Sequence, residues 1–274
     1  MERFRKQVEE AAGFIQSRLG DIQPRIGLIL GTGLSGVGEA MENGIALSYE
    51  EIPHFPASTA PSHKGQLLCG MWAGKPVLAM QGRFHLYEGY TPGQVSFPIR
   101  IMAALGIRTL ILSNAAGGLN PLFRSGDLML ITDHINLTGH NPLLGPNVDE
   151  WGPRFSDMTA PYSLRLQDLA TKTALGERIQ LHRGVYVGVT GPNLETAAET
   201  RFFRIIGGDA IGMSIIMECI TAVHAGLEVL GISVITNVNL PDHYTPVPVA
   251  QIISTAEEAG PRLMTLLGSI LGQL

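Results

Sequence analysis

The chain has 274 residues, of which 45% are apolar and 16% are charged, and 19 basic against 24 acidic side chains give a formal net charge of −5. A chain of this length and composition buries a large core, which excludes a disordered protein and a small scaffold that depends on disulfides. The acidic balance argues against a nucleic-acid partner, because there is no basic excess to neutralise phosphates.

The first predicted element is an amphipathic helix that ends near Gly20. Its apolar side chains recur at helical spacing, at Phe4, Val8, Ala11, Ile15 and Leu19. Short apolar runs typical of buried strands follow at Ile26–Leu30, Val77–Met80, Leu110–Leu112, Leu128–Thr132, Val185–Val189 and Val229–Thr236. Helical stretches lie between several of them, around residues 95–105, 161–175, 195–206, 215–226 and 249–271.

Strands that alternate with helices predict an α/β fold with a central mixed sheet flanked by helices. No linker, composition break or internal repeat divides the chain, so we predict a single domain over residues 1–274. Thr138–Pro161 is rich in Gly, Pro and Asn and has little periodicity. This stretch is predicted to be a long loop, and long loops in compact domains are often functional.

Residues 31–36 have the sequence GTGLSG, directly after the first predicted strand, and Glu50 follows about 20 residues later. The pattern G-x-G-x-x-G matches a dinucleotide fingerprint, but the segment behind it lacks the helix that should receive a pyrophosphate. A nicotinamide site is therefore the weaker interpretation. The favoured one is an anion site made by backbone N–H groups and the Thr32 hydroxyl. A plain strand-to-loop turn is the remaining alternative.

Residues 81–90, QGRFHLYEGY, follow the next predicted strand and hold the densest set of candidate functional side chains. Arg83, His85 and Tyr87 alternate, so that in an extended backbone they point to one side. An arginine fork suits a phosphate or a carboxylate, and a histidine beside it can donate to the same anion. Since α/β folds bind ligands at strand ends, an anion site is predicted here. The alternative is a surface salt-bridge cluster with Glu88.

Four further segments follow strands or apolar runs, and each has an ordinary structural alternative. Ser113–Leu119 consists of small residues that let a ligand approach the backbone, or it is a plain turn. Glu195 lies near a predicted helix N-terminus, where the dipole favours a carboxylate, so it either binds a ligand or acts as a cap. Met213, next to Ser214, is a ligand contact or part of the core. Asn237, at a strand end, is a ligand contact or a turn residue.

Cys69 and Cys219 lie far apart and form no C-x-x-C pattern, so neither a disulfide framework nor a metal site is expected. The first ten residues, MERFRKQVEE, are charged and have no apolar stretch behind them, which predicts no signal peptide. No run of about 18 apolar residues predicts a membrane span. We therefore expect a soluble cytoplasmic protein with no membrane partner.

Taken together and in this order, several segments resemble the trimeric purine nucleoside phosphorylase family. They are GTGLSG, APSHKGQL, QGRFHLYEGY, SNAAGGLN, DHIN, NPLLGPN, GPNLETAAE, GMS and ITN, and they cover roughly residues 25–237. The resemblance implies the nucleoside phosphorylase fold, a homotrimer, and an enzyme that needs no cofactor or metal. Its expected reaction is phosphorolysis of 6-oxopurine nucleosides, such as inosine and guanosine, to free base and ribose 1-phosphate in purine salvage.

The resemblance also implies the site residues by position. The expected phosphate pocket consists of Thr32, His63, Arg83, His85, Ala115 and Ser214. The purine would meet Leu194, Glu195 and Asn237, and the ribose would meet Tyr87, Met213 and His243. Phe155, in the long loop, resembles the aromatic residue that a neighbouring subunit lends to the site. The expected catalytic residues are Asn237, Glu195 and His85.

This chain departs from the family pattern in two places. The family usually continues T-V-P-E after the serine, whereas this chain has IIME at residues 215–218 and lacks the proline that starts the next helix. The family histidine that meets the ribose 5′-hydroxyl has no clear counterpart. Either His243 folds back into the pocket or Val247 and Val249 face it, and the prolines on both sides of Val247 favour the apolar wall.

Two alternative functions follow from these features. An apolar 5′ region indicates a phosphorylase of 5′-methylthio nucleosides, although relatives that act on methylthioadenosine typically carry aspartate at the position of Asn237, which favours a 6-oxopurine here. A binding protein that had lost catalysis would lack a phosphate residue, and the expected set is complete.

Overall fold

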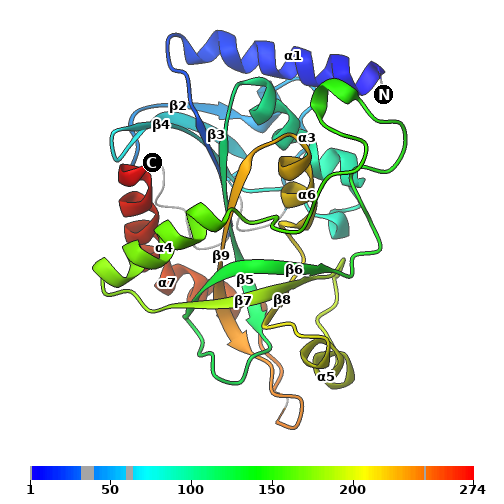
Figure 1. Ribbon diagram of the computed structural model, residues 1–274, viewed down its shortest axis with the longest axis vertical. Coiled ribbons are helices and arrows are strands. Elements are labelled where there is room, and N and C mark those ends of the chain that lie inside the picture. Colours follow the sequence, from blue (N-terminus) through cyan, green and yellow to red (C-terminus); the bar gives the residue numbers. More distant parts are fainter. Residues whose placement is uncertain (1, 32–39, 60–63, 244) are drawn as a thin grey trace.

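The structure is a computed structural model that describes residues 2–31, 40–59, 64–243 and 245–274 (Figure 1). Its helices are α1 (Glu2–Leu19), α3 (Pro92–Ala104), α4 (Leu164–Gly176), α5 (Ala197–Ile205), α6 (Ile216–His224) and α7 (Val249–Gln273). Short 3₁₀ turns are η1 (Tyr49–Glu51), η2 (Leu86–Glu88) and η3 (Asp149–Trp151). The strands are β1 (Ile26–Leu30), β2 (Glu42–Ser48), β3 (Gln66–Trp72), β4 (Lys75–Gln81), β5 (Thr109–Gly118), β6 (Leu128–Asn136), β7 (Leu181–Gly188), β8 (Ala210–Gly212) and β9 (Glu228–Val238). Within these described ranges, no helix has the length and apolar character to cross a membrane.

The described strands form one mixed sheet in the order β2-β3-β4-β1-β5-β8-β7-β6-β9. Strand β9 pairs with β6 and also runs parallel to β5, so the last five strands of this order close into a ring. Strand β1 lies parallel to both β4 and β5. The carboxyl ends of β1, β4, β5 and β9 therefore meet at one edge, and β8 pairs with the final residues of β5 there.

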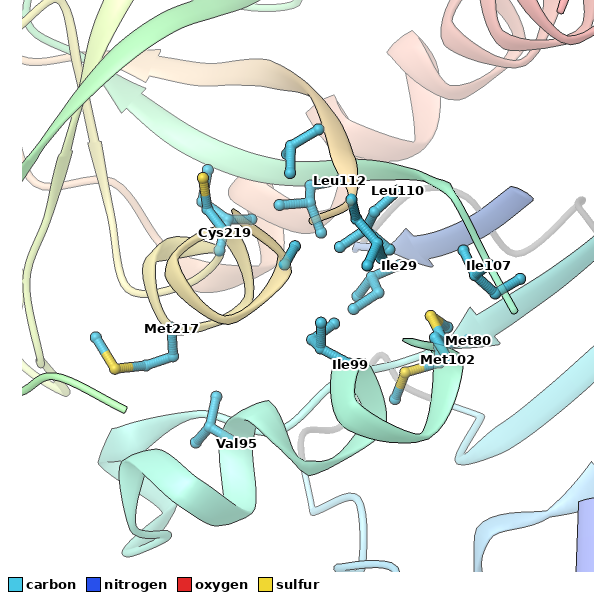
Figure 2. Close-up of a cluster of buried hydrophobic side chains, with 14 of the residues drawn as sticks. Ile29, Met80, Val95, Ile99, Met102, Ile107, Leu110, Leu112, Met217 and Cys219 are labelled. Atoms are coloured by element: carbon cyan, nitrogen blue, oxygen red, sulfur yellow. The ribbon is translucent and has the colours of Figure 1, made fainter. Parts of the chain in front are cut away.

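Two hydrophobic clusters cover the two faces of the sheet. Successive strand residues point to opposite faces. Ile29 and Leu112 join the cluster that α1, α3 and α6 cover, whereas Leu28 and Ile111 join the one that α4 and α7 cover. Figure 1 shows α3 and α6 to the right of β5 and β9, with α4 and α7 to the left. Figure 2 shows part of the first cluster, in which Ile29 and Leu112 lie among side chains of α3 and α6. This packing fixes the strand ends that form the site.

The predicted α/β fold with a central mixed sheet is confirmed. Each predicted helix and strand is present, and most of the strands extend beyond their apolar runs. Strands β2, β3 and the short β8 are not among the predicted strands. Strand β2 is an exposed edge strand with the polar start Glu42-Asn43-Gly44, and its pairing with β3 is irregular after Glu42. Opposite this irregularity β3 contains Gly70, where a Cβ atom would lie 2.9 Å from the Glu42 carbonyl oxygen. A glycine inside a strand weakens the apolar pattern that sequence analysis depends on.

Candidate active site

A cavity of about 300 Å³ lies at the edge where the parallel strands end. The expected residues that line it are Arg83, His85, Tyr87, Ala115, Leu194, Glu195, Met213, Ser214 and Asn237. Thr32 and His63 lie outside the described residues. The structure thus brings together side chains from segments more than 100 residues apart. Its volume lies at the lower end of the range for small-ligand sites.

Arg83 marks one end of the cavity. Its side chain is 2% exposed, and its guanidinium donates a hydrogen bond to the Ser113 carbonyl oxygen in the middle of β5. Gly31, directly after β1, makes this crossing possible, because a Cβ atom there would lie 2.9 Å from both the Arg83 Nη2 and the Ser113 oxygen. The first glycine of the GTGLSG motif therefore serves the packing of Arg83.

His85 is held by Glu88 one 3₁₀ turn later. The Glu88 carboxylate accepts hydrogen bonds from the His85 Nδ1 and from its backbone N–H, both at 2.8 Å. Burial lowers the pKa of His85, and Glu88 opposes that shift. Burial raises the pKa of Glu88, but hydrogen bonds from His85 and Thr59 outweigh this effect and lower it to about 2. An ionised Glu88 makes the Nδ1 atom of His85 a donor, so this pair is part of the site and not a surface cluster.

The alternation expected for Arg83, His85 and Tyr87 is not what brings them together. Tyr87 lies in η2, where the backbone is a 3₁₀ turn and not extended. It still lines the cavity, because its ring stacks on His85 with the centroids 4.6 Å apart and the planes at 16°.

A second carboxylate, Glu218 in α6, lies behind the Arg83 end of the cavity. It is 2% exposed, and no described group hydrogen-bonds either of its carboxylate oxygens. Burial raises the pKa of Glu218, and the charge of Arg83 opposes this shift. A separate cavity of about 10 Å³, the size of one water molecule, lies between Glu218, His85 and Ser214.

Glu195 and Asn237 lie at the other end of the main cavity and are joined through Asn239. The Asn239 side-chain amide donates to Glu195 Oε1, and Asn237 Nδ2 donates to Asn239 Oδ1 at 2.8 Å. The Thr236 hydroxyl lies 3.1 Å from Asn237 Oδ1. Burial raises the pKa of Glu195, while the hydrogen bond from Asn239 opposes this shift. This end of the cavity is a planar polar edge with both donors and acceptors.

Helix α5 begins directly after Glu195. Thr196 is its N-cap and Glu199 closes a capping box with it, so the capping carboxylate is Glu199 and not Glu195. Leu194 is 47% exposed at the rim. The capping role that was the structural alternative for Glu195 is thus taken by Thr196 and Glu199.

The missing proline corresponds to Met217, in the first turn of α6, and the backbone before this helix has an unusual conformation. Ile215, the N-cap residue, has φ of 63°, in the left-handed region, and provides no side-chain cap. It follows Ser214, whose backbone N–H donates to the Tyr186 hydroxyl at 3.3 Å. Ser214 therefore keeps its place in the cavity wall without the proline.

The region expected to meet the ribose 5′ end is apolar. Val249 and Ile252, from the first turn of α7, line the cavity. His243 is exposed and is not among the described residues that line it, and Val247 is half-buried outside it. The structure therefore has the apolar wall that the prolines on both sides of Val247 favour. Val249 is part of this wall, but Ile252 stands in it in place of Val247.

Phe155 does not line this cavity. It is 88% exposed, with the Arg154 guanidinium 5.5 Å from its ring centre. It lines a different groove of about 400 Å³ together with His134, Leu143 and Met158. The structure does not bring Phe155 to the other candidate residues of the same chain.

Glu88, Glu218 and Asn239 are the site residues that sequence analysis missed. Glu88 was assigned to the alternative, a salt-bridge cluster, although it stands in the most specific motif. Glu218 follows an apolar run. Asn239 stands two residues beyond Asn237, after the apolar pattern of β9 has ended. Neither position has a local signal, because each acts through a partner that is distant in sequence. Within the described residues, no cluster of three or more His, Cys, Asp or Glu side chains is arranged to hold a metal ion.

Comparisons with known proteins agree with this geometry. A model of the phosphorylase superfamily matches residues 25–272. Purine nucleoside phosphorylase 1 of Bacillus subtilis is 48% identical over 270 residues, which cover 98% of this chain and 99% of that protein. Purine nucleoside phosphorylase of Bos taurus is 46% identical over 226 residues, which cover 81% of this chain and 78% of that protein. A solved structure of a schistosome purine nucleoside phosphorylase in complex with hypoxanthine has a TM-score of 0.92 at 36% identity, covering 98% of this chain and 97% of that one. The chain therefore belongs to the phosphorylase superfamily, in the family of the purine nucleoside phosphorylases that its motifs predicted.

Proposed function

We propose that this chain is an enzyme that cleaves 6-oxopurine nucleosides with phosphate, giving the free base and ribose 1-phosphate. One observation carries the proposal: a single cavity of about 300 Å³ is lined both by Arg83 and His85 and by Glu195 and Asn237. Arg83 bonds to Ser113 of β5, whereas Asn237 pairs with Gly117, farther along the same strand, so the two pairs lie at different ends. The first pair suits an anion and the second suits the polar edge of a purine. The names of the relatives and the hypoxanthine bound to the schistosome enzyme support the same reaction.

At the phosphate end, the enzyme holds the nucleophile in position. The bond between ribose C1′ and purine N9 breaks, its electron pair goes to the purine, and a phosphate oxygen forms the new bond to C1′. The proton that the hydrogen phosphate loses ends on the purine, which leaves as the neutral base. Arg83 and His85 would fix the phosphate below C1′, together with Ser214 and the backbone of Ala115, and such positioning lowers the barrier. The phosphate charge also stabilises the positive charge that develops on the sugar. The reaction needs no covalent enzyme intermediate, and we propose that it needs no metal or cofactor.

At the purine end, the enzyme stabilises the leaving group. Negative charge builds on the purine as the C1′–N9 bond breaks, and the Asn237 amide would donate to N7. Glu195 would accept the N1 hydrogen of a 6-oxopurine. Donors that are aimed at developing charge contribute strongly to catalysis, because they need no reorganisation during the reaction.

The homotrimer and the cytoplasmic location that the resemblance implies belong to the same proposal. The exposed Phe155 beside an apolar groove supports an assembly in which a neighbouring subunit uses this residue. The buried free thiols of Cys69 and Cys219 are typical of a protein in a reducing compartment. Release of free base there would serve purine salvage.

The test is base release from inosine with and without phosphate. We expect hypoxanthine and ribose 1-phosphate in equal amounts when phosphate is present, and no release without it. Release at the same rate in the absence of phosphate would identify a hydrolase and reject the proposal.

A second candidate, a phosphorylase of 5′-methylthio nucleosides, is favoured by the apolar wall of Val249 and Ile252. An apolar group at the ribose 5′ position would gain about 0.8 kcal/mol for each buried methylene-sized unit. Since Asn237 and Glu195 suit a 6-oxopurine, the substrate in this case would be methylthioinosine.

The two candidates are separated by comparing inosine, 5′-deoxyinosine and 5′-methylthioinosine in the wild type and in His243→Ala. The apolar wall predicts that both analogues are used at least as well as inosine, and that His243→Ala changes nothing. A steep loss with both analogues, together with a poor His243→Ala enzyme on inosine, would assign the 5′ end to His243.

A further inference from the structure

The long loop over residues 138–161, which carries Phe155, is held near its centre by a helix of its own chain. Figure 1 shows this loop beside the start of α1. His224, the last residue of α6, is 3% exposed, and its ring Nε2 lies 3.1 Å from the side-chain oxygen of Asn147. A Cβ atom at Gly152 would collide with the His224 carbonyl oxygen, so the loop backbone passes directly over the end of α6. His224 therefore contacts the loop through both its side chain and its backbone.

Arg100 of α3 contacts the other ring nitrogen of His224. It is 7% exposed, and its guanidinium donates to His224 Nδ1 at 2.9 Å. The same guanidinium lies over the ring of Trp151 in the loop, 4.8 Å from the ring centre. Burial lowers the pKa of Arg100 to about 10, which is still far above neutral pH. A buried charged group thus acts on the loop through the Trp151 ring and through His224.

The direction of each hydrogen bond in this set follows from Arg100, which can only donate. His224 Nδ1 must therefore accept, and its second nitrogen, Nε2, carries the proton and donates to Asn147 Oδ1. The Asn147 amide nitrogen then donates to Asp149 Oδ1 at 2.8 Å and to the Gly152 carbonyl oxygen at 2.9 Å. Burial and the charge of Arg100 lower the pKa of His224 to about 4, so at neutral pH the ring is neutral and fills both roles.

These bonds fix residues 147–152, and Phe155 follows three residues later. Phe155 is 88% exposed, so packing within its own chain does little to set its position. Its position on the surface therefore depends on the fixed segment just before it. In the homotrimer that we propose, this position decides whether the ring reaches the purine site of the neighbouring subunit.

We propose that Arg100, His224 and Asn147, here called the loop anchor, are positioning residues for the purine site of the neighbouring subunit. The inference rests on the proposed function and the proposed homotrimer, and it adds residues that neither assigns. His224 is not among the described residues that line the cavity of its own chain, so it acts through the loop and Phe155. A merely structural role would affect both substrates, whereas this role affects the nucleoside, and in a different subunit from the one that carries His224.

The first measurement compares KM for the two substrates. His224→Leu removes both hydrogen bonds of the ring, and KM for inosine should rise about three- to tenfold, the effect of one lost hydrogen bond. KM for phosphate should keep its wild-type value. His224→Gln restores an acceptor for Arg100 and a donor for Asn147, so it should recover most of the wild-type KM for inosine. Asn147→Ala breaks the loop anchor from the loop side and should reproduce the effect, which covers the case that His224→Leu does not fold.

Glu150→Gln is the matched control. Glu150 belongs to the same loop, and it forms an exposed ion pair with Arg5 of α1 at 3.2 Å. Exposed ion pairs contribute little to stability, so both KM values should stay at the wild-type level.

Trp151 reports the state of the loop without an activity assay. The chain has two tryptophans, and Trp72 belongs to the cluster on the other face of the sheet, so Trp72→Phe leaves Trp151 as the single emitter. On this background, His224→Leu should shift the emission to longer wavelength, because a Trp151 ring released from Arg100 and Phe4 meets more water. His224→Gln should leave the emission unchanged.

The decisive measurement mixes variants by denaturation and refolding, with inosine below its KM. A His224→Leu subunit keeps its own Arg83 but presents Phe155 to its neighbour in the wrong position. Mixed with Arg83→Ala subunits, it should give activity above the sum of the separately refolded enzymes. Mixed with Phe155→Ala subunits, it should give no such gain, because every site then receives a defective loop.

The inference is overturned if His224→Leu and Asn147→Ala leave KM for inosine unchanged, or raise KM for both substrates equally. It is also overturned if the Trp151 emission of His224→Leu matches that of the background. A gain with Phe155→Ala, or no gain with Arg83→Ala, has the same consequence. The proposed function fails in a different way, through the absence of phosphate-dependent base release from inosine in the wild type.

Discussion

At the scale of single residues, two carboxylates near the phosphate end have opposite protonation tendencies. The pKa of Glu88 is low, about 2, because His85 and Thr59 hydrogen-bond its charged form and outweigh burial. The pKa of Glu218 is raised, because burial outweighs the attraction of Arg83. The two carboxylates near the phosphate end therefore differ in the direction of their pKa shifts, which is downward for Glu88 beside His85 and upward for Glu218 near Arg83.

The first prediction concerns Glu88→Gln. Burial lowers the pKa of His85 and the Glu88 carboxylate raises it, so removal of the carboxylate lowers the pKa of His85 further. If the imidazolium binds phosphate, activity falls as the pH rises through that pKa. The alkaline limb of kcat/KM for phosphate should therefore move to lower pH in the variant. The pH profiles of the wild type and of Glu88→Gln contain the same titration of phosphate. The difference between them therefore reports a titration of the enzyme.

Thr59→Val is the control for this change, because it removes a hydrogen bond to Glu88 but keeps its charge. Its alkaline limb should stay close to that of the wild type. Superimposable profiles for the wild type and Glu88→Gln would mean that His85 does not bind phosphate as the imidazolium.

The second prediction concerns Arg83. Arg83→Ala should raise KM for phosphate by roughly 10- to 100-fold, because a hydrogen bond to a charged group contributes about 1.5–3 kcal/mol. KM for inosine should change little, since the purine is held at the other end of the cavity. Arg83→Lys keeps the charge but loses the planar fork, so its KM for phosphate should lie between those of the wild type and Arg83→Ala. Steady-state kinetics with each substrate varied in turn provides the measurement, and an unchanged KM for phosphate in Arg83→Ala would contradict the assignment.

The third prediction concerns stability and Glu218. A carboxyl whose pKa is raised by folding stabilises the fold while it is protonated, and this contribution is lost as the pH rises through the folded-state pKa. Glu218→Gln has no such loss, so its melting temperature should exceed that of the wild type above the ordinary glutamate value of 4.5, by a margin that grows with pH. Below that value the two should melt together.

Thermal denaturation across a pH series tests this prediction, with the exposed Glu9→Gln as a control that should show no such trend. A variant less stable than the wild type at neutral pH would show that the charge of Glu218 is needed to pair with Arg83.

At the scale of secondary-structure elements, the start of α5 positions the purine-binding carboxylate. The Thr196 hydroxyl accepts from the Glu199 N–H at 3.2 Å, and Glu195 directly precedes this cap. Thr196→Ala should cost about 1 kcal/mol of stability. It should also raise KM for inosine but not for phosphate. Thr196→Ser retains the cap and should behave like the wild type in both assays. An equal rise in KM for inosine and for phosphate in Thr196→Ala would show that the cap does not position the purine site specifically.

The elements that could be predicted from the sequence are those with a strong apolar pattern. Strands β1, β4, β5, β6, β7 and β9 are buried and read as apolar runs, and α7 has a clear helical period. Strand β2 is an exposed edge, and β3 is interrupted by Gly70, so both lack the pattern. The pattern reports burial, so it is silent at the exposed β2, whereas β3 is buried and its apolar run is broken by Gly70.

The same limit applies within the site. Arg83, His85, Glu195 and Asn237 stand in motifs that resemble a known family, and the structure brings all four to one cavity. Asn239 and Glu218 act through side chains that are distant in sequence, so only the folded structure shows their partners. Phe155 is a third case, because its proposed partner is on another chain.

At the scale of the whole molecule, the exposed Phe155 argues for a shared active site. Full burial of a phenylalanine side chain contributes about 1.5–3 kcal/mol, and Phe155 is 88% exposed beside a groove of about 400 Å³. The loop that carries it is anchored through Asn147, whose side chain bonds to His224 of α6 at 3.1 Å. The loop is thus held in place, while its aromatic residue is exposed and does not line the main cavity of its own chain. In the homotrimer that we propose, a neighbouring subunit would complete its purine site with this ring.

The last prediction tests this by complementation. If each site uses its own Arg83 and a neighbour's Phe155, then Arg83→Ala and Phe155→Ala enzymes are each impaired alone. Mixed trimers should regain activity, because a Phe155→Ala subunit that keeps Arg83 receives an intact Phe155 from an Arg83→Ala neighbour. The measurement is the activity on inosine of subunits mixed by denaturation and refolding, compared with the sum of the separately refolded enzymes. Activity above that sum supports a shared site. Mixed samples that only match the sum, or a monomer that is fully active at assay dilution, would show that each chain completes its site alone.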